Sequence, residues 1–134
     1  MPIARPIQPE DASPEVKAVF DDIMATRKTD WINDFWKVLA HHPPTLKRTW
    51  ESLKQVMAPG TALDPLTKEM IYLAVSITNG CEYCIASHTA AARAKGMTEA
   101  MLGELIGVIG MANETNALVT AYQVEVDERF RQAP

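Results

Sequence analysis

The chain has 134 residues, of which 47% are hydrophobic and 22% charged, and its formal net charge is −4. This length suits one globular domain with its own core, and no apolar run approaches the ~18 residues that a membrane span needs. Basic residues are scattered and the chain start lacks an apolar signal segment, so we expect a cytoplasmic protein without nucleic-acid or membrane partners.

The first half of the chain predicts an arm and three helices. Residues 1–12 contain three prolines, so we expect an extended arm that lies over the body or over a neighbouring subunit. Capping residues, prolines at first helical positions and apolar residues at helical spacing predict helices at about 13–27, 30–40 and 44–57. Trp31, Trp36 and Trp50 are expected to form part of the core, because aromatic residues at helical spacing are usually buried.

The second half predicts further helices. Residues 64–79 are almost wholly apolar, so this helix is expected to be buried in the middle of the domain. Gly80 stops it, and the next helix runs to residue 95. A helix at about 98–106 follows, and beyond Gly107 and Gly110 we expect a final helix through Phe130. No stretch has a convincing strand period, so the sequence predicts an all-α, single-domain bundle of six or seven helices over residues 13–134.

The residues with the most reactive side chains are concentrated in one stretch of the chain. The only two cysteines, Cys81 and Cys84, are three positions apart, and His88 follows the second by four. In a helix, these spacings place all three side chains on successive turns of one face. In a reducing compartment such a Cys-x-x-Cys pair is more often redox-active or metal-binding than structural.

Two effects could activate these thiols, and they favour different sulfurs. Cys81 lies at the start of its helix, where the unpaired N–H groups and the helix dipole stabilise an anion. Cys84 has the imidazole of His88 one turn away as a proton acceptor. Glu69 lies about as far before the turn at Gly80 as His88 lies after it, so an antiparallel helix hairpin would let them meet. A carboxylate there would orient the imidazole.

The same residue types also occur in metal sites, haem attachment motifs and inert cores. Cys81, Cys84 and His88 could ligate zinc, but a fourth ligand would have to come from the distant His41 or His42. Haem attachment needs a histidine directly after the second cysteine, where the chain has isoleucine. Inert buried cysteines and a surface glutamate are the remaining structural alternatives.

The pattern Glu69, then Cys81-x-x-Cys84-x-x-x-His88, then Gly96, resembles the signature of the AhpD-like branch of the carboxymuconolactone decarboxylase family. The flanking residues 39–43 and 68–76 agree, and the resemblance covers about residues 35–110. It implies an all-helical homo-oligomer that acts as an alkylhydroperoxidase or disulfide reductase. The resemblance requires no metal or organic cofactor, only an external thiol reductant.

The resemblance also implies roles for individual residues. Cys84 would attack the peroxide, Cys81 would resolve the sulfenic acid to a disulfide, and His88 with Glu69 would relay protons. Family members often carry a second histidine where this chain has Tyr83, and a phenol relays protons less readily than an imidazole at neutral pH. The decarboxylase branch shares the fold without depending on a cysteine pair. A lactone decarboxylase-type lyase using His88 and Glu69, and a non-catalytic oligomeric binding protein, therefore stay as alternatives.

Overall fold

The computed structural model describes residues 1–132, and among them it has seven α-helices, one 3-10 helix and no β-strand. The predicted all-α fold class is therefore confirmed. By its contacts the chain divides into two compact units, Met1–Ala58 and Pro59–Pro134. This division does not test the prediction of one domain over residues 13–134, which stays a prediction. No helix in the described range combines the length and the apolar character that crossing a membrane requires.

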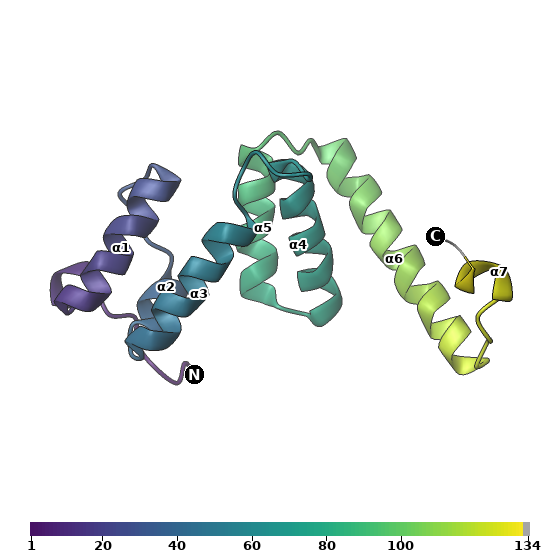
Figure 1. The fold of residues 1–134 in the computed structure, drawn as a ribbon, viewed down its shortest axis with the longest axis horizontal. Helices are drawn as coiled ribbons and strands as arrows, with labels where there is room; N and C mark the ends of the chain where they lie inside the picture. Colours follow the sequence, from purple (N-terminus) through teal and green to yellow (C-terminus); the bar gives the residue numbers. More distant parts are fainter. Residues whose placement is uncertain (133–134) are drawn as a thin grey trace. The chain divides into compact units, whose positions relative to one another are not determined.

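The first unit contains the 3-10 helix η1 (Pro9–Asp11) and the helices α1 (Pro14–Arg27), α2 (Asp34–Leu39) and α3 (Pro43–Val56) (Figure 1). Local capping starts the two longer helices. The Ser13 hydroxyl accepts a hydrogen bond from the backbone N–H of Val16 at 3.3 Å, and the His42 imidazole accepts one from Thr45 at 3.3 Å. The three α-helices share one core, whose buried members are Val16, Val19, Phe20, Ile23, Ile32, Trp36, Ala40, Leu46 and Trp50.

The N-terminal arm packs against this same unit. The backbone N–H of Ile7 donates to the carbonyl of Lys37 at 3.1 Å, and the His41 ring nitrogen Nε2 lies 2.7 Å from the Arg5 carbonyl. The arm is not extended throughout, because η1 forms a short turn within it.

The expectation that all three tryptophans are buried is wrong for one of them. Trp36 and Trp50 are buried and meet edge to face, with ring centroids 5.4 Å apart. Trp31 is 61% exposed. The reason is that α2 begins at Asp34, later than the predicted 30, so Trp31 precedes the helical face that is turned to the core.

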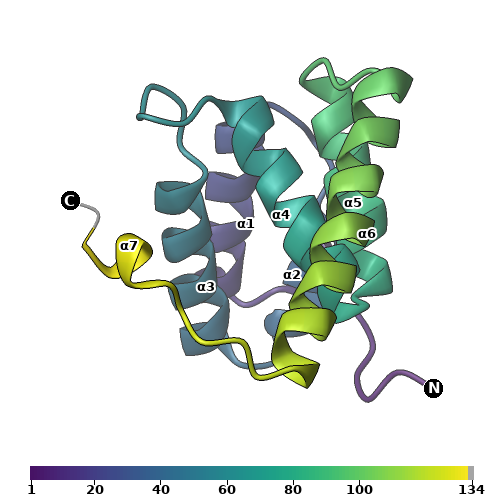
Figure 2. The same ribbon diagram turned by 90° about the vertical axis from the view of Figure 1, so that its right-hand side faces the viewer.

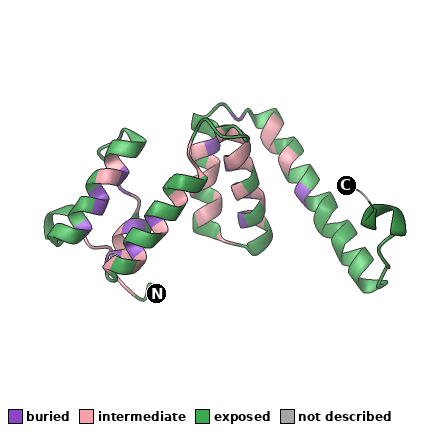
Figure 3. Cartoon of the chain, viewed as in Figure 1, coloured by how far each residue is buried: buried purple, intermediate pink, exposed green. Residues whose placement is uncertain are grey.

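The second unit contains α4 (Pro65–Asn79), α5 (Glu82–Ala94), α6 (Glu99–Ala121) and α7 (Glu128–Arg131). Helix α4 packs against both α5 and α6, and Figure 2 shows the three helices beside one another. Their core is small and is centred on Leu73, Ala92 and Met97. The predicted burial of α4 is wrong for part of its surface, because Ile71 and Val75 are exposed. Figure 3 shows exposed as well as buried residues along this helix.

Two predicted helices at the end of the chain are one helix in the structure. Helix α6 continues through Gly107 and Gly110, because a glycine inside a helix costs only about 1 kcal/mol relative to alanine and removes no hydrogen bond. It ends at Ala121 rather than reaching Phe130. Gln123 adopts a left-handed φ of 51°, and the N–H of Val124 closes back on the carbonyl of Val119 at 3.1 Å.

Candidate active site

A tight connection between α4 and α5 positions the site residues. Gly80 has a φ of 68°, which glycine adopts without the steric penalty of other residues. The N–H of Gly80 then bonds the carbonyl of Ile77 at 3.1 Å, and the N–H of Cys81 bonds that of Ser76 at 3.0 Å. These two bonds form the closing motif of a helix C-terminus. The backbone N–H of Cys81 therefore closes the C-terminus of α4, and the same residue directly precedes α5.

The two cysteines lie at the N-terminus of α5. Cys81 is the N-cap residue, and its Sγ accepts a hydrogen bond from the N–H of Cys84 at 3.3 Å. The two sulfurs are joined as a disulfide, with the Cα atoms 5.3 Å apart. Both residues are partly exposed. The pair is thus placed to exchange between dithiol and disulfide at the protein surface.

The expected meeting of Glu69 and His88 is present. Oε2 of Glu69, on α4, lies 2.7 Å from Nδ1 of His88, on α5. The Glu69 side chain is only 8% exposed, so this contact lies largely out of water. The antiparallel hairpin brings together two residues that are 19 positions apart in the chain.

Two further residues complete this cluster, and the sequence did not single them out. Nζ of Lys95, just beyond the last turn of α5, donates to Oε1 of Glu69 at 3.1 Å. The ring of Tyr72 stacks on the His88 imidazole, with centroids 3.7 Å apart and planes inclined by 21°. Each carboxylate oxygen of Glu69 therefore has its own partner, and the imidazole is held from the side as well as through Nδ1.

Burial and pairing act in opposite directions on Glu69. Burial raises the pKa of its carboxyl group, but the hydrogen bonds from His88 and Lys95 together outweigh burial, and the net pKa lies below the usual 4.5. Glu69 is therefore ionised at neutral pH and can only accept hydrogen bonds. In their shared bond Nδ1 of His88 therefore donates, and Nε2 is the ring nitrogen that remains available to a thiol.

The two cysteines are close to His88 in sequence but are not hydrogen-bonded to it. No hydrogen bond among residues 1–132 joins His88 to either sulfur. Tyr83, between the cysteines, lies in the first turn of α5 and is 48% exposed. The roles assigned to Cys81, Cys84, His88, Glu69 and Tyr83 stay predictions.

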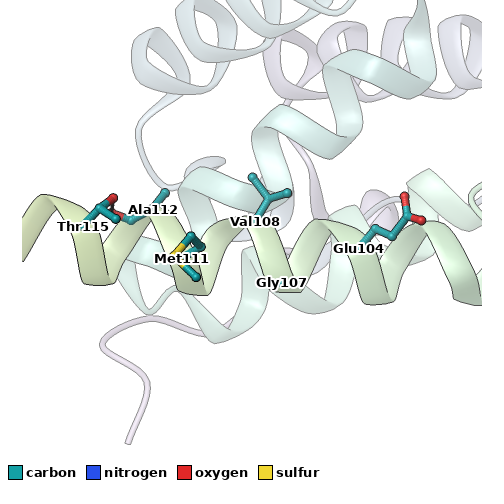
Figure 4. Close-up of a pocket in the computed structure, with 6 residues that line it drawn as sticks. All are labelled: Glu104, Gly107, Val108, Met111, Ala112 and Thr115. Atoms are coloured by element: carbon teal, nitrogen blue, oxygen red, sulfur yellow. Dashed lines mark hydrogen bonds between the residues drawn. The ribbon is translucent and has the colours of Figure 1, made fainter.

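Grooves in the second unit lie away from this chemistry. One is an open depression along α6 itself, lined by Glu104, Gly107, Val108, Met111, Ala112 and Thr115 (Figure 4). Another lies between α4 and α6, next to Val75 and Ala112. Neither groove is lined by the cysteines, His88 or Glu69.

The histidines proposed as a fourth zinc ligand have structural bonds in the first unit. His41 contacts the Arg5 carbonyl, and His42 caps α3. Within the described part of the chain, no three His, Cys, Asp or Glu side chains are arranged to hold a metal ion.

Comparison with known proteins identifies the family of this chain. Residues 43–125, well over half of its length, match the carboxymuconolactone decarboxylase family. The chain belongs to this family. The match extends further towards the C-terminus than the predicted resemblance at 35–110 and includes all of α6.

Two similar proteins are informative. The alkylhydroperoxidase AhpD core from Rhodospirillum rubrum, a crystal structure, is 57% identical with a TM-score of 0.95, and 99% of each chain is covered. The predicted AhpD-like membership is thereby confirmed. An uncharacterized protein from Haemophilus influenzae is 33% identical over 66 residues, which are 45% of this chain and 58% of that protein. The chain thus spans less than two thirds of this curated relative.

Proposed function

We propose that this protein is a thiol-dependent hydroperoxidase that cycles Cys81 and Cys84 between dithiol and disulfide. The observation that carries the proposal is the cysteine pair at bonding distance on α5, the same helix on which His88 is held by a buried glutamate. The similarity to a protein named alkylhydroperoxidase supports it. Reduction of a partner protein's disulfide by the same dithiol is the related activity that this chemistry also serves.

The oxidative step uses Cys84 as the nucleophile. His88 Nε2 takes the thiol proton, and the thiolate attacks the terminal oxygen of an organic hydroperoxide. The S–O bond forms as the O–O bond breaks. The departing alkoxide takes the proton from His88, so the products are a sulfenic acid on Cys84 and an alcohol.

The sulfenic acid is then resolved within the protein. The Cys81 sulfur attacks the Cys84 sulfur, the S–S bond forms as the S–O bond breaks, and the leaving hydroxide takes the Cys81 proton and becomes water. An external dithiol reduces the disulfide by thiol–disulfide exchange and is itself oxidised. In this cycle Tyr83 contributes a hydrogen bond near the sulfurs rather than a proton relay.

Titration of thiols tests this function directly. The reduced protein is given one equivalent of cumene hydroperoxide and its free thiols are counted. We expect the wild type to lose both thiols, and Cys81→Ser to accumulate a dimedone-reactive sulfenic acid on Cys84. Cys84→Ser should react no faster than a free thiol. Unreacted wild-type thiols would refute the proposal. Lactone decarboxylation that survives loss of both cysteines would favour the lyase instead.

We also propose that the chain self-associates through α6. This helix is apolar nearly all round, yet Ile109 is its only buried residue, and Ile106, Val108 and Met111 are exposed. A helix of that character is normally buried. The depression at Gly107 has no side chain within 4 Å of an added Cβ, so another helix could approach closely there. A second copy of this chain offers the same surface and makes a symmetric contact.

Sedimentation at micromolar concentration tests self-association. We expect the wild type to sediment as an oligomer and Met111→Lys, which puts a charge on the exposed apolar surface, to dissociate. The control Gln55→Lys adds the same charge on an exposed position of α3 and should stay oligomeric. A monomeric wild type would contradict the proposal.

A further inference from the structure

The side chain of Lys95 does not cap the C-terminus of α5. The backbone N–H of Lys95 already bonds the carbonyls of Ala91 and Ala92 at 3.2 and 3.1 Å, so the helix end is satisfied without the side chain. The next residues close α5 through Gly96, which has a φ of 103°. The side chain instead reaches across to α4 and donates to Oε1 of Glu69.

The partners of Glu69 come from one segment of the chain. Its carboxylate bonds His88, on α5, and Lys95, just beyond the last turn of α5, and against the effect of burial these hydrogen bonds lower the pKa of the carboxyl group. Helix α6 packs on α4 as well, but its first acid, Glu99, pairs with Arg93 at 2.9 Å. No charged group of α6 bonds Glu69 among the described residues. Among residues 1–132, Lys95 is therefore the one permanent positive charge bonded to this carboxylate.

Resting on the function proposed above, we propose that Lys95 is a positioning residue that acts through Glu69 and keeps Nε2 of His88 free to accept a proton. Because the ionised carboxylate of Glu69 can only accept, the hydrogen of the 2.7 Å contact lies on Nδ1, and Nε2 is the ring nitrogen left to take a proton from a thiol.

Without the ammonium group, the buried pair binds a second proton more readily, since a nearby positive charge no longer opposes it. That proton has two places to go. On the imidazole it occupies Nε2 directly. On the carboxyl group it makes Glu69 a donor to Nδ1, which moves the imidazole proton to Nε2. Both outcomes remove the acceptor that Cys84 needs, so a pure structural role for Lys95 and this role make different predictions.

The first measurement is the pH dependence of thiol oxidation. Rates with tert-butyl hydroperoxide are followed from about pH 5.5 to 8.5 in the wild type, Lys95→Met, Lys95→Arg and the control Lys47→Met, which removes an exposed lysine of α3. We expect Lys95→Met to move the acidic midpoint up by about one pH unit, a roughly tenfold lower rate on that limb. Lys95→Arg and Lys47→Met should keep the wild-type midpoint.

The second measurement does not depend on activity. Nitrogen NMR of the imidazole distinguishes the two tautomers and the protonated ring in the reduced protein. We expect bare Nε2 on His88 in the wild type and protonated Nε2 in Lys95→Met at pH 7, with Lys95→Gln as a second neutral variant. If the wild-type thiols do not react with hydroperoxide, the proposed function fails. The NMR comparison of the wild type with the Lys95 variants still decides the role of Lys95. A wild-type pH profile and tautomer in both neutral variants would overturn the inference.

Discussion

The substitution Glu69→Gln removes the charge at the centre of the site while keeping the shape of the side chain. Glu69 accepts one hydrogen bond from the titratable imidazole of His88 at 2.7 Å and one from the ammonium group of Lys95 at 3.1 Å. A hydrogen bond to a charged group contributes about 1.5–3 kcal/mol, and the amide of glutamine keeps one acceptor of the two. Lys95 is 40% exposed and can turn to water. We therefore expect a loss of about 2 kcal/mol in the free energy of unfolding.

The loss can be measured as a melting temperature by circular dichroism at fixed protein concentration. For a chain of this size about 4 °C per kcal/mol applies, so Glu69→Gln should melt about 8 °C lower at pH 7.5. Because the pKa of Glu69 is lowered in the folded state, its stabilisation is complete well above the usual 4.5 and is lost as pH falls below that value. The difference between variant and wild type should therefore shrink at pH 3.5.

A matched control uses the same substitution in an exposed ion pair. Glu99 pairs with Arg93 at 2.9 Å, but its side chain is 77% exposed. Glu99→Gln should cost no more than about 1 kcal/mol. Equal melting temperatures for the wild type and Glu69→Gln at pH 7.5, or a difference that grows on acidification to pH 3.5, would refute the reasoning.

Three further predictions concern other contacts. Tyr72→Leu removes the ring stacked on His88 and should slow hydroperoxide consumption several-fold, whereas Tyr72→Phe keeps the stack and the rate. Asp22→Ala leaves the buried Trp50 N–H without its acceptor at 2.7 Å, so chemical unfolding followed by tryptophan fluorescence should show a loss of about 1–3 kcal/mol. Gly80→Ala meets no atom within 4 Å but strains a φ of 68°, so urea unfolding should show a loss of about 1–2 kcal/mol without a change in m-value.

Local chemistry made much of the fold predictable. Ser13 and Asp64 are residue types that favour the N-cap position, and their side chains accept from the backbone N–H groups of Val16 and Thr67 three residues on. Gly80 ends α4 in the left-handed conformation that its position predicted. Each of these features depends on neighbours within one turn, so the residues themselves carry the information.

Features that depend on packing were predicted less well. The glycines of α6 do not interrupt it, because the small cost of a glycine does not decide whether a long apolar helix continues. The contact of Glu69 with His88 could be expected from equal distances to the turn. The contact of Lys95 with Glu69 could not be predicted, because the two residues are 26 positions apart and a lysine after the last helical turn is common at a helix C-terminus. Only the register of α5 against α4 reveals what that side chain bonds.

The structure also bears on which sulfur is stabilised as a thiolate. The helix dipole favours Cys81, whereas His88 favours Cys84. Sγ of Cys81 accepts the N–H of Cys84 at the N-cap of α5, so the site stabilises negative charge on Cys81. When a reductant attacks the disulfide, the better-stabilised thiolate is the better leaving group. In the proposed cycle the cap therefore favours attack at Cys84 with Cys81 leaving. In the proposed oxidative half-cycle, Cys84 is again the sulfur that meets the external reagent, with His88 as its base. In this proposal the helix dipole and the imidazole serve opposite halves of one cycle and do not compete for the same thiolate.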